Sequence, residues 1–204
     1  MKKIFGIIAA TFLMASAHAQ IQVDRTKKPA SGPAPVITIK DPVTFKLANG
    51  ITVLVVENHK LPKVNATFSI DAGPVTEGSK AGVMSIMGQM LSEGTTTKTK
   101  AQFDELTDGM GANLGLSSSG GNVSALTRYF KDAFMLMAEA LKQPAFPQES
   151  FDKIKSQAIT GLKTSEKSVK AIAARTTNAL MYGLDHPNGE FETEQTINNI
   201  TLAD

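Results

Sequence analysis

Alternation of apolar and polar positions predicts five short strands, because successive side chains of a strand point to opposite faces. Asn49-Gly50 and Gly120-Gly121 each lie between two alternating runs. Both pairs predict hairpin turns, the first of them a two-residue turn. The expected strands are residues 45–47, 51–55, 64–73, 113–117 and 122–126.

Elsewhere apolar residues recur at intervals of three and four, which is the spacing of one helix face. Pro144 ends one of these runs. The expected helices are residues 82–95, 99–110, 130–141, 148–163 and 169–182. Because strands and helices segregate rather than alternating one for one, we predict an α+β fold. Its expected form is a two-layer sandwich, with a mostly antiparallel sheet and helices packed on one face.

Several methionines lie at helical spacing, and this spacing favours a role as core fillers over a soft-metal or adaptable binding surface. The residues concerned are Met84, Met87, Met90, Met135 and Met137.

The expected helix at residues 82–95 has two distinct faces. Val83, Ile86, Met87, Met90 and Leu91 form the apolar face, while Ser85, Gly88 and Gln89 share another. These three residues have the spacing of the inverted zinc motif H-x-x-E-H, which places two histidine ligands and a catalytic glutamate on one helix. The segment resembles the insulinase/pitrilysin family of zinc peptidases, with each motif residue replaced.

The flanking sequence carries the same resemblance, which runs from about Val43 to the last residue. No single match is specific, but the matches come in the family's order and spacing. They are Leu47–Val53, Ala72-Gly73 with Glu77, Gly94-Thr95, Gly111–Asn113, Phe146-Pro147 with Phe151, Tyr182-Gly183, His186-Pro187 with Gly189, and Thr196–Thr201.

The resemblance implies a third zinc ligand, a glutamate on a later helix similar to residues 151–162. In the alignment Gly161 takes the ligand position and Ile154 takes that of a second family carboxylate. Zinc requires imidazole, thiolate or carboxylate donors. We therefore predict no catalytic residue, no metal site and no cofactor, although active family members hold zinc. Glu166 is the remaining candidate for a displaced ligand if the alignment slips.

Active members of the family also bind an extended peptide along an edge strand near residues 111–119. A substrate-contacting Asn-Ala pair of the family corresponds here to Gly115-Leu116. Backbone pairing would survive this change, because strand addition uses main-chain groups. The alternative is a bare structural edge. The candidate peptide-binding residues are Gly111, Asn113, Gly115, Leu116 and Ser117.

The N-terminal residues predict export. Lys2 and Lys3 precede an apolar run at residues 4–14, and Ala17-His18-Ala19 has the small-x-small form of a cleavage site. We expect a signal peptide at 1–19, a Pro-rich linker at 20–40 and a single family domain at 41–204. The mature protein would lie in the periplasm of a Gram-negative source and would otherwise be secreted. The apolar run is too short for a membrane anchor, so no membrane contact is expected after cleavage.

Composition excludes further classes of function. The chain is 42% hydrophobic and 20% charged, as ordinary globular domains are. Without Lys2 and Lys3 its 21 basic residues become 19, which equals the number of acidic residues. No basic stripe with interleaved aromatic residues occurs, so nucleic acid is not an expected partner. With no cysteine, the chain has neither a disulfide nor a lipid-attachment thiol.

Thr201–Asp204 has the S/T-x-x-acid pattern of a helix start. We therefore expect a domain that is incomplete at its C-terminus. Family subunits continue into a second, similar domain and work as paired halves or heterodimers. The resemblance thus implies an exported non-catalytic subunit or half, which supports peptide binding and chamber closure with a zinc-bearing partner or with its own missing second half.

Two other functions remain open. The chain could be a free-standing exported scaffold or binding domain that keeps only the fold. It could also be an active zinc metalloendopeptidase with unrecognised ligands, for which Glu166, His59 and His186 are the candidates. The two histidines are isolated from other ligand residues, which counts against this alternative.

The export signal makes a direct prediction: the mature protein begins at Gln20, because the charged start, apolar run and cleavage site occur in the required order. The intact mass of protein recovered from the exported fraction measures this. A mature mass that still includes residues 1–19 would contradict it.

Overall fold

The computed structural model describes residues 31–34 and 41–204. It divides into two units, residues 1–57 and residues 58–204, and each is described by itself. The expected signal peptide and most of the expected linker lie outside the described residues.

In the first unit, β1 (Val43–Lys46) and β2 (Thr52–Val55) form an antiparallel hairpin. The predicted hairpin is confirmed, but its turn is longer than the expected two residues. The Gly50 N–H donates to the Leu47 carbonyl at 2.9 Å, and Leu47 in turn donates to Ile51 at 2.8 Å. Gly50 has a φ of +89°, a left-handed conformation that glycine adopts without strain. Because Leu47 pairs with Ile51, the loop consists of residues 48–50, and Gly50 is its third residue.

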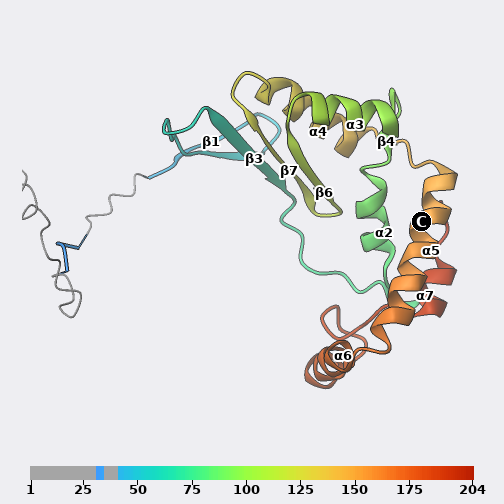
Figure 1. Cartoon of the computed structure of the whole chain (residues 1–204). Helices are drawn as coiled ribbons and strands as arrows, with labels where there is room; N and C mark the ends of the chain where they lie inside the picture. The colour runs from blue at the N-terminus through green and yellow to red at the C-terminus, as the bar shows by residue number, and fades with distance from the viewer. Residues whose placement is uncertain (1–30, 35–40) are drawn as a thin grey trace, which may run out of the picture. The chain divides into compact units, whose positions relative to one another are not determined.

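The second unit contains a three-stranded antiparallel sheet in the order β3-β7-β6. The strands are β3 (Lys63–Ser69), β6 (Asn113–Ser117) and β7 (Gly120–Leu126). Alternation places one set of apolar side chains on a single face, where helix α4 (Phe130–Lys142) packs across the strands (Figure 1). This packing of a helix on an antiparallel sheet confirms the predicted α+β class. The packed residues are Ala66, Leu114, Leu116, Val123, Ala125, Ala133 and Met137.

The turn between β6 and β7 consists of Ser118 and Ser119, so the prediction that Gly120-Gly121 forms this turn is wrong. Both glycines lie within β7. A Cβ atom on Gly120 would lie 2.1 Å from the Phe68 carbonyl oxygen of β3, and its φ is +139°. Glycine is needed here because the neighbouring strand approaches closely, not because the chain reverses.

Helix α3 (Lys100–Gly109) begins and ends at residues with recognisable signals. Thr99 and Gln102 form a capping box at its start. At its end Gly111 has a φ of +56°, and the N–H groups of Gly111 and Ala112 bond back to the last turn. The helix buries Phe103 with Leu136 and Ala140 of α4. Two short strands before it, β4 (Gly94–Thr95) and β5 (Lys98–Thr99), were not predicted.

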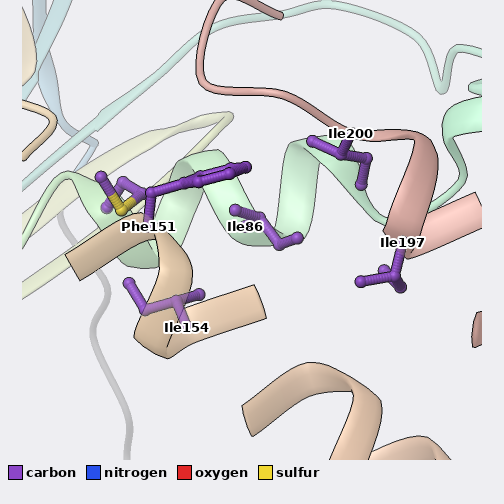
Figure 2. Packing of buried hydrophobic residues seen from close by; sticks show 6 residues of the cluster. Ile86, Phe151, Ile154, Ile197 and Ile200 are labelled. Carbon is purple, nitrogen blue, oxygen red and sulfur yellow. The ribbon is translucent and has the colours of Figure 1, made fainter. Parts of the chain in front are cut away.

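A second core lies among the helices α2 (Val83–Met90), α5 (Gln148–Ser165) and α7 (Glu194–Asn199). Figure 2 shows side chains from all three directed toward one another. The buried members are Ile86, Met90, Phe151, Ile154, Ile197 and Ile200. The short helix α7 was not predicted, because its capping box pairs Thr193 with Thr196 and so lacks the Glu or Gln of the usual sequence signature.

Helix α6 (Val169–Tyr182) buries none of its residues, and the 3-10 turn η2 (Gly78–Lys80) precedes α2.

Of the methionines expected in the core, Met90 and Met137 are buried, whereas Met84 and Met135 are exposed. The prediction fails for these two because helical spacing alone does not say how wide the buried stripe is. No helix in the described ranges is both long and apolar enough to cross a membrane.

The loop at residues 183–193 is tied to the segment before α2 by a carboxylate. Glu190 accepts hydrogen bonds from the backbone N–H groups of Glu77 and Gly78, at 2.8 and 2.9 Å. Asn199 of α7 donates to the Ser79 carbonyl at 2.9 Å. These contacts join segments more than 100 residues apart in sequence, as their spans of 113 and 120 residues show.

Glu139 of α4 holds the β4–β5 connection. Its carboxylate accepts hydrogen bonds from Lys98 Nζ at 2.6 Å, Thr95 Oγ1 at 2.6 Å and Thr97 Oγ1 at 2.5 Å. These bonds, the one from Lys98 foremost, lower the pKa of Glu139 to about 2. Thr95 is itself buried, so the carboxylate satisfies a hydroxyl that water cannot reach.

We predict that Glu139→Gln destabilises the folded chain by about 1–2 kcal/mol at neutral pH, because charge-assisted hydrogen bonds become neutral ones and the site is partly open to solvent. Since the folded pKa lies below the ordinary carboxylate value, this contribution is complete above about pH 4.5 and is lost as pH falls toward 2. Urea unfolding at a series of pH values measures it, with Glu105→Gln on the exposed side of α3 as control. A difference from wild type that does not shrink in acid would contradict the assignment.

Candidate functional site

The residues that match the zinc motif line a pocket between α2, α5 and the turn after β6. The pocket has a volume of about 550 Å³. Three elements that are distant in sequence form its walls, and the motif helix contributes the largest share. The lining residues are Met84, Ser85, Gly88, Gln89, Ser92, Glu93, Leu116, Ser117, Ser118, Ile154 and Gln157.

The amphipathic pattern of α2 determines which residues face this pocket. Ile86 and Met90 are buried against α5 and α7. Ser85 and Gln89 lie on the adjacent face of the helix, exposed toward the pocket. Among the described residues, the Gln89 amide has one hydrogen-bond partner, the Ser85 carbonyl of the same helix, at a long 3.4 Å.

Gly88 allows the helix to approach the sheet. It is buried, and a Cβ atom at this position would lie 3.2 Å from the Ser118 backbone nitrogen and 3.4 Å from the Ser117 Cα. The first distance is shorter than an ordinary van der Waals contact, and the second lies at its lower limit. A larger residue at the position of the family's catalytic glutamate would therefore have to displace the β6–β7 turn.

The start of α2 is held by charged groups rather than by a capping hydroxyl. The Glu77 carboxylate accepts a hydrogen bond from the Gly82 N–H at 2.5 Å. Gly82 has a φ of +106°, and a Cβ atom there would lie 2.4 Å from Ile197 Cδ1. Burial raises the pKa of the nearby Glu192, and the Glu77 charge adds to the effect. These contacts orient the helix that carries the motif positions.

The donor groups of the pocket do not fit zinc. Ser85, Gly88 and Gln89 provide hydroxyl, no side chain and amide, where the motif would provide two imidazoles and a carboxylate. Among the residues that the structure describes, the lining has one carboxylate, Glu93, which is already paired. It accepts a 2.8 Å hydrogen bond from Ser150 and lies 3.8 Å from Lys100 Nζ. In the part of the chain that the structure describes, no three His, Cys, Asp or Glu residues are grouped to hold a metal.

The later helix contributes Ile154 and Gln157 to the lining, and Gly161 is not part of it. Gly161 lies in open space, with nothing within 4 Å of a Cβ atom built on it. Glu166 follows the end of α5, and His186 stacks on Tyr182 with ring centroids 5.3 Å apart; neither lines the pocket. Gln157 was not singled out from the sequence, although it lies one turn after Ile154 on the same helix.

The candidate peptide-binding residues lie along and just before β6. This strand is at the edge of its sheet, since no other strand of the described residues pairs with its second side. Gly111 lies in the turn that precedes it. The Asn122 side chain lies across Gly115, whose Cβ atom would meet Asn122 Oδ1 at 2.3 Å. Leu116 packs into the sheet core, and Ser117 reaches the pocket. Edge and pocket are therefore adjacent.

The two helical glycines provide a matched prediction. Gly161→Ala should stabilise the chain by about 0.5–1 kcal/mol, because alanine is the better helix former and the site is open. Gly88→Ala should give no gain or a net loss, since the same helical preference is opposed by contact with the β6–β7 turn. Urea unfolding of both variants and the wild type decides this. Equal gains at the two positions would show that α2 is not pressed against β6.

Comparison with known proteins places this geometry in a family. A sequence profile described as Insulinase (Peptidase family M16) matches residues 52–190. A protein of Helicobacter pylori named "Non-peptidase homolog YmxG" is 24% identical over 161 residues, which is 76% of this chain and 37% of that protein. The chain thus spans well under half the length of this relative.

Solved structures agree. The crystal structure of a peptidase M16 inactive domain from Pseudomonas fluorescens is 27% identical, with a TM-score of 0.71, covering 80% of this chain and 42% of that one. The periplasmic protease PqqL of Escherichia coli is 18% identical, with a TM-score of 0.64 and coverages of 83% and 20%. A protease from Helicobacter pylori is 15% identical, with a TM-score of 0.65 and coverages of 80% and 41%. The last two show the fold alone.

The profile covers more than half of the chain, and the motif positions carry neither zinc ligands nor a general base. The chain therefore belongs to the insulinase family, peptidase family M16, as a non-catalytic domain.

Proposed function

We propose that this domain is exported and holds extended peptides along β6, while a zinc-bearing family partner, or a second half of the same protein, supplies any proteolysis. The observation that carries the proposal is the open pocket at the motif position beside the unpaired edge of β6. A strand edge recognises peptide backbone, and an adjacent pocket can accept one of the peptide's side chains.

The proposal of a second domain is supported by the architecture that the family resemblance implies and by the share of its relatives that this chain spans. The chain spans 37% of the Helicobacter pylori relative and 42% of the Pseudomonas fluorescens domain structure. A second family domain facing the pocket would close a chamber around a peptide on β6. In this arrangement the present domain contributes binding surface, because its pocket lacks donors for metal-assisted hydrolysis.

Export is proposed from the N-terminal signal alone, which lies outside the described residues. The absence of cysteine is compatible with an oxidising compartment, because no thiol is present to be oxidised. A periplasmic location would place the domain where unfolded and partly degraded peptides occur.

Peptide binding is tested with a labelled peptide of about eight residues, the length of a long strand, alternating valine and threonine. We expect binding that persists in excess chelator, with no cleavage. A copy of the peptide with every second backbone nitrogen methylated should bind about tenfold more weakly, because strand addition uses those N–H groups. Fluorescence anisotropy measures the affinity, and mass spectrometry of the peptide detects cleavage.

The outcomes separate the parts of the proposal. One tightly held zinc per chain, with chelator-sensitive cleavage, would overturn the non-catalytic assignment. If the methylated and unmethylated peptides bind with equal affinity, binding by strand addition is contradicted and the scaffold function remains. The partner is tested separately by sedimentation of the chain with and without a family protein that carries H-x-x-E-H. If the two proteins sediment as independent species, the proposed association with a zinc-bearing partner is contradicted.

A further inference from the structure

The polar groups of the motif pocket are largely unpaired within the protein. Among the described residues, the side-chain hydroxyl of Ser85 and the amide of Gln157 make no hydrogen bond, and the Gln89 amide has only its long bond at 3.4 Å. The Ser118 hydroxyl is likewise unpaired. Amides and hydroxyls both donate and accept hydrogen bonds. The pocket wall therefore offers both kinds of group to whatever enters it.

The charge of the pocket selects against ionic ligands. Of the described residues, the lining includes one ionisable side chain, Glu93, and its carboxylate is engaged by Ser150 at 2.8 Å and by Lys100 at 3.8 Å. Its side chain is only 17% exposed. A ligand carboxylate would find no cation in the wall, and a ligand ammonium would have to compete with Lys100. Either would lose hydration without gaining a dedicated counter-ion.

A purely apolar group fits no better. Gln89 and Gln157 are exposed to solvent, so an apolar group lying over their amides would displace water from them without replacing its hydrogen bonds, which is unfavourable. The chemistry that suits this wall is an uncharged group that donates and accepts at once. The volume of about 550 Å³ lies within the range of small-molecule sites and accommodates an amino-acid side chain.

The position of Ser117 connects the pocket to the strand edge, since this residue ends β6 and also lines the pocket. Alternate side chains of a strand added to β6 would point to the same side. Building on the peptide-binding function proposed above, we propose that the pocket binds a carboxamide, the side chain of Asn or Gln, of a peptide held on β6. The former zinc position is thus a recognition site for a neutral polar residue.

The absence of cysteine from the chain makes a direct test practical. Ser118→Cys places one thiol at the pocket wall. The variant is equilibrated, in 2-mercaptoethanol, with four disulfide probes of equal length that end in carboxamide, carboxylate, ammonium or isopropyl. We expect the carboxamide probe to label about tenfold more than the others, the ratio that one or two net hydrogen bonds provide. Intact mass measures the labelled fraction.

Two controls make the result specific. Ser156→Cys carries its thiol on the exposed side of α5, outside the pocket, and should label equally with all four probes. Gln89→Leu with Gln157→Leu, combined with Ser118→Cys, should abolish the carboxamide preference while leaving the chain folded by circular dichroism. If Ser118→Cys disturbs the turn, Ser92→Cys places the thiol at another point of the same lining.

Equal labelling by the four probes in the pocket variant would overturn the proposal, as would a preference for the carboxylate, ammonium or isopropyl probe. The result is independent of strand addition. A carboxamide preference together with failed peptide binding would leave the pocket assignment intact and remove the peptide-binding function. Peptide binding without a carboxamide preference would support the peptide-binding function and contradict the pocket assignment.

Discussion

The packing of α2 on two sides is the constraint on which the rest of the site depends. One side is held by the apolar cluster of Ile86 and Met90 with α5 and α7, and another by the contact of Gly88 with the β6–β7 turn. These two contacts lie on different faces of one helix of eight residues. The helix can then neither rotate nor withdraw without breaking one of them, so the motif positions stay directed into the pocket.

In an active family member, zinc would join the motif helix to the later helix through the metal's ligands, as the resemblance implies. Here apolar burial makes that connection, and polar contacts at the periphery extend it. Glu190 ties the distant C-terminal loop to the backbone just before α2. Glu139 holds the segment that follows α2 against α4. The architecture of the site is therefore maintained by ordinary core packing and hydrogen bonding, with no contribution required from a metal.

Periodicity predicted the elements whose burial is one-sided. Helix α2, helix α4 and the strands of the main sheet all have a clear apolar face, and the faces of α2 correctly placed Ser85, Gly88 and Gln89 together. The predictions were wrong where the same short sequence is compatible with more than one backbone structure. A Gly-Gly pair is compatible with a turn and also with a strand that lies very close to its neighbour. For Gly120-Gly121, the pairing of β7 with Phe68 of β3 shows that the second structure is present. Gln157 was missed because the alignment placed the ligand position at Gly161, one turn further along α5, whereas the lining contains Ile154 and Gln157.

The residues that stand at the zinc-motif positions indicate whether the pocket has only lost a zinc site or now binds another ligand. If the domain needed only its fold, apolar residues at positions 85 and 89 would bury additional surface, at roughly 25 cal/mol for each Å². The chain has serine and glutamine there, and glutamine reappears across the pocket at position 157. Such residues make the wall of the cavity polar, and they forgo the stabilisation that apolar burial would provide. A polar pocket beside the unpaired edge of β6 supports the proposed peptide-binding function over a purely structural role.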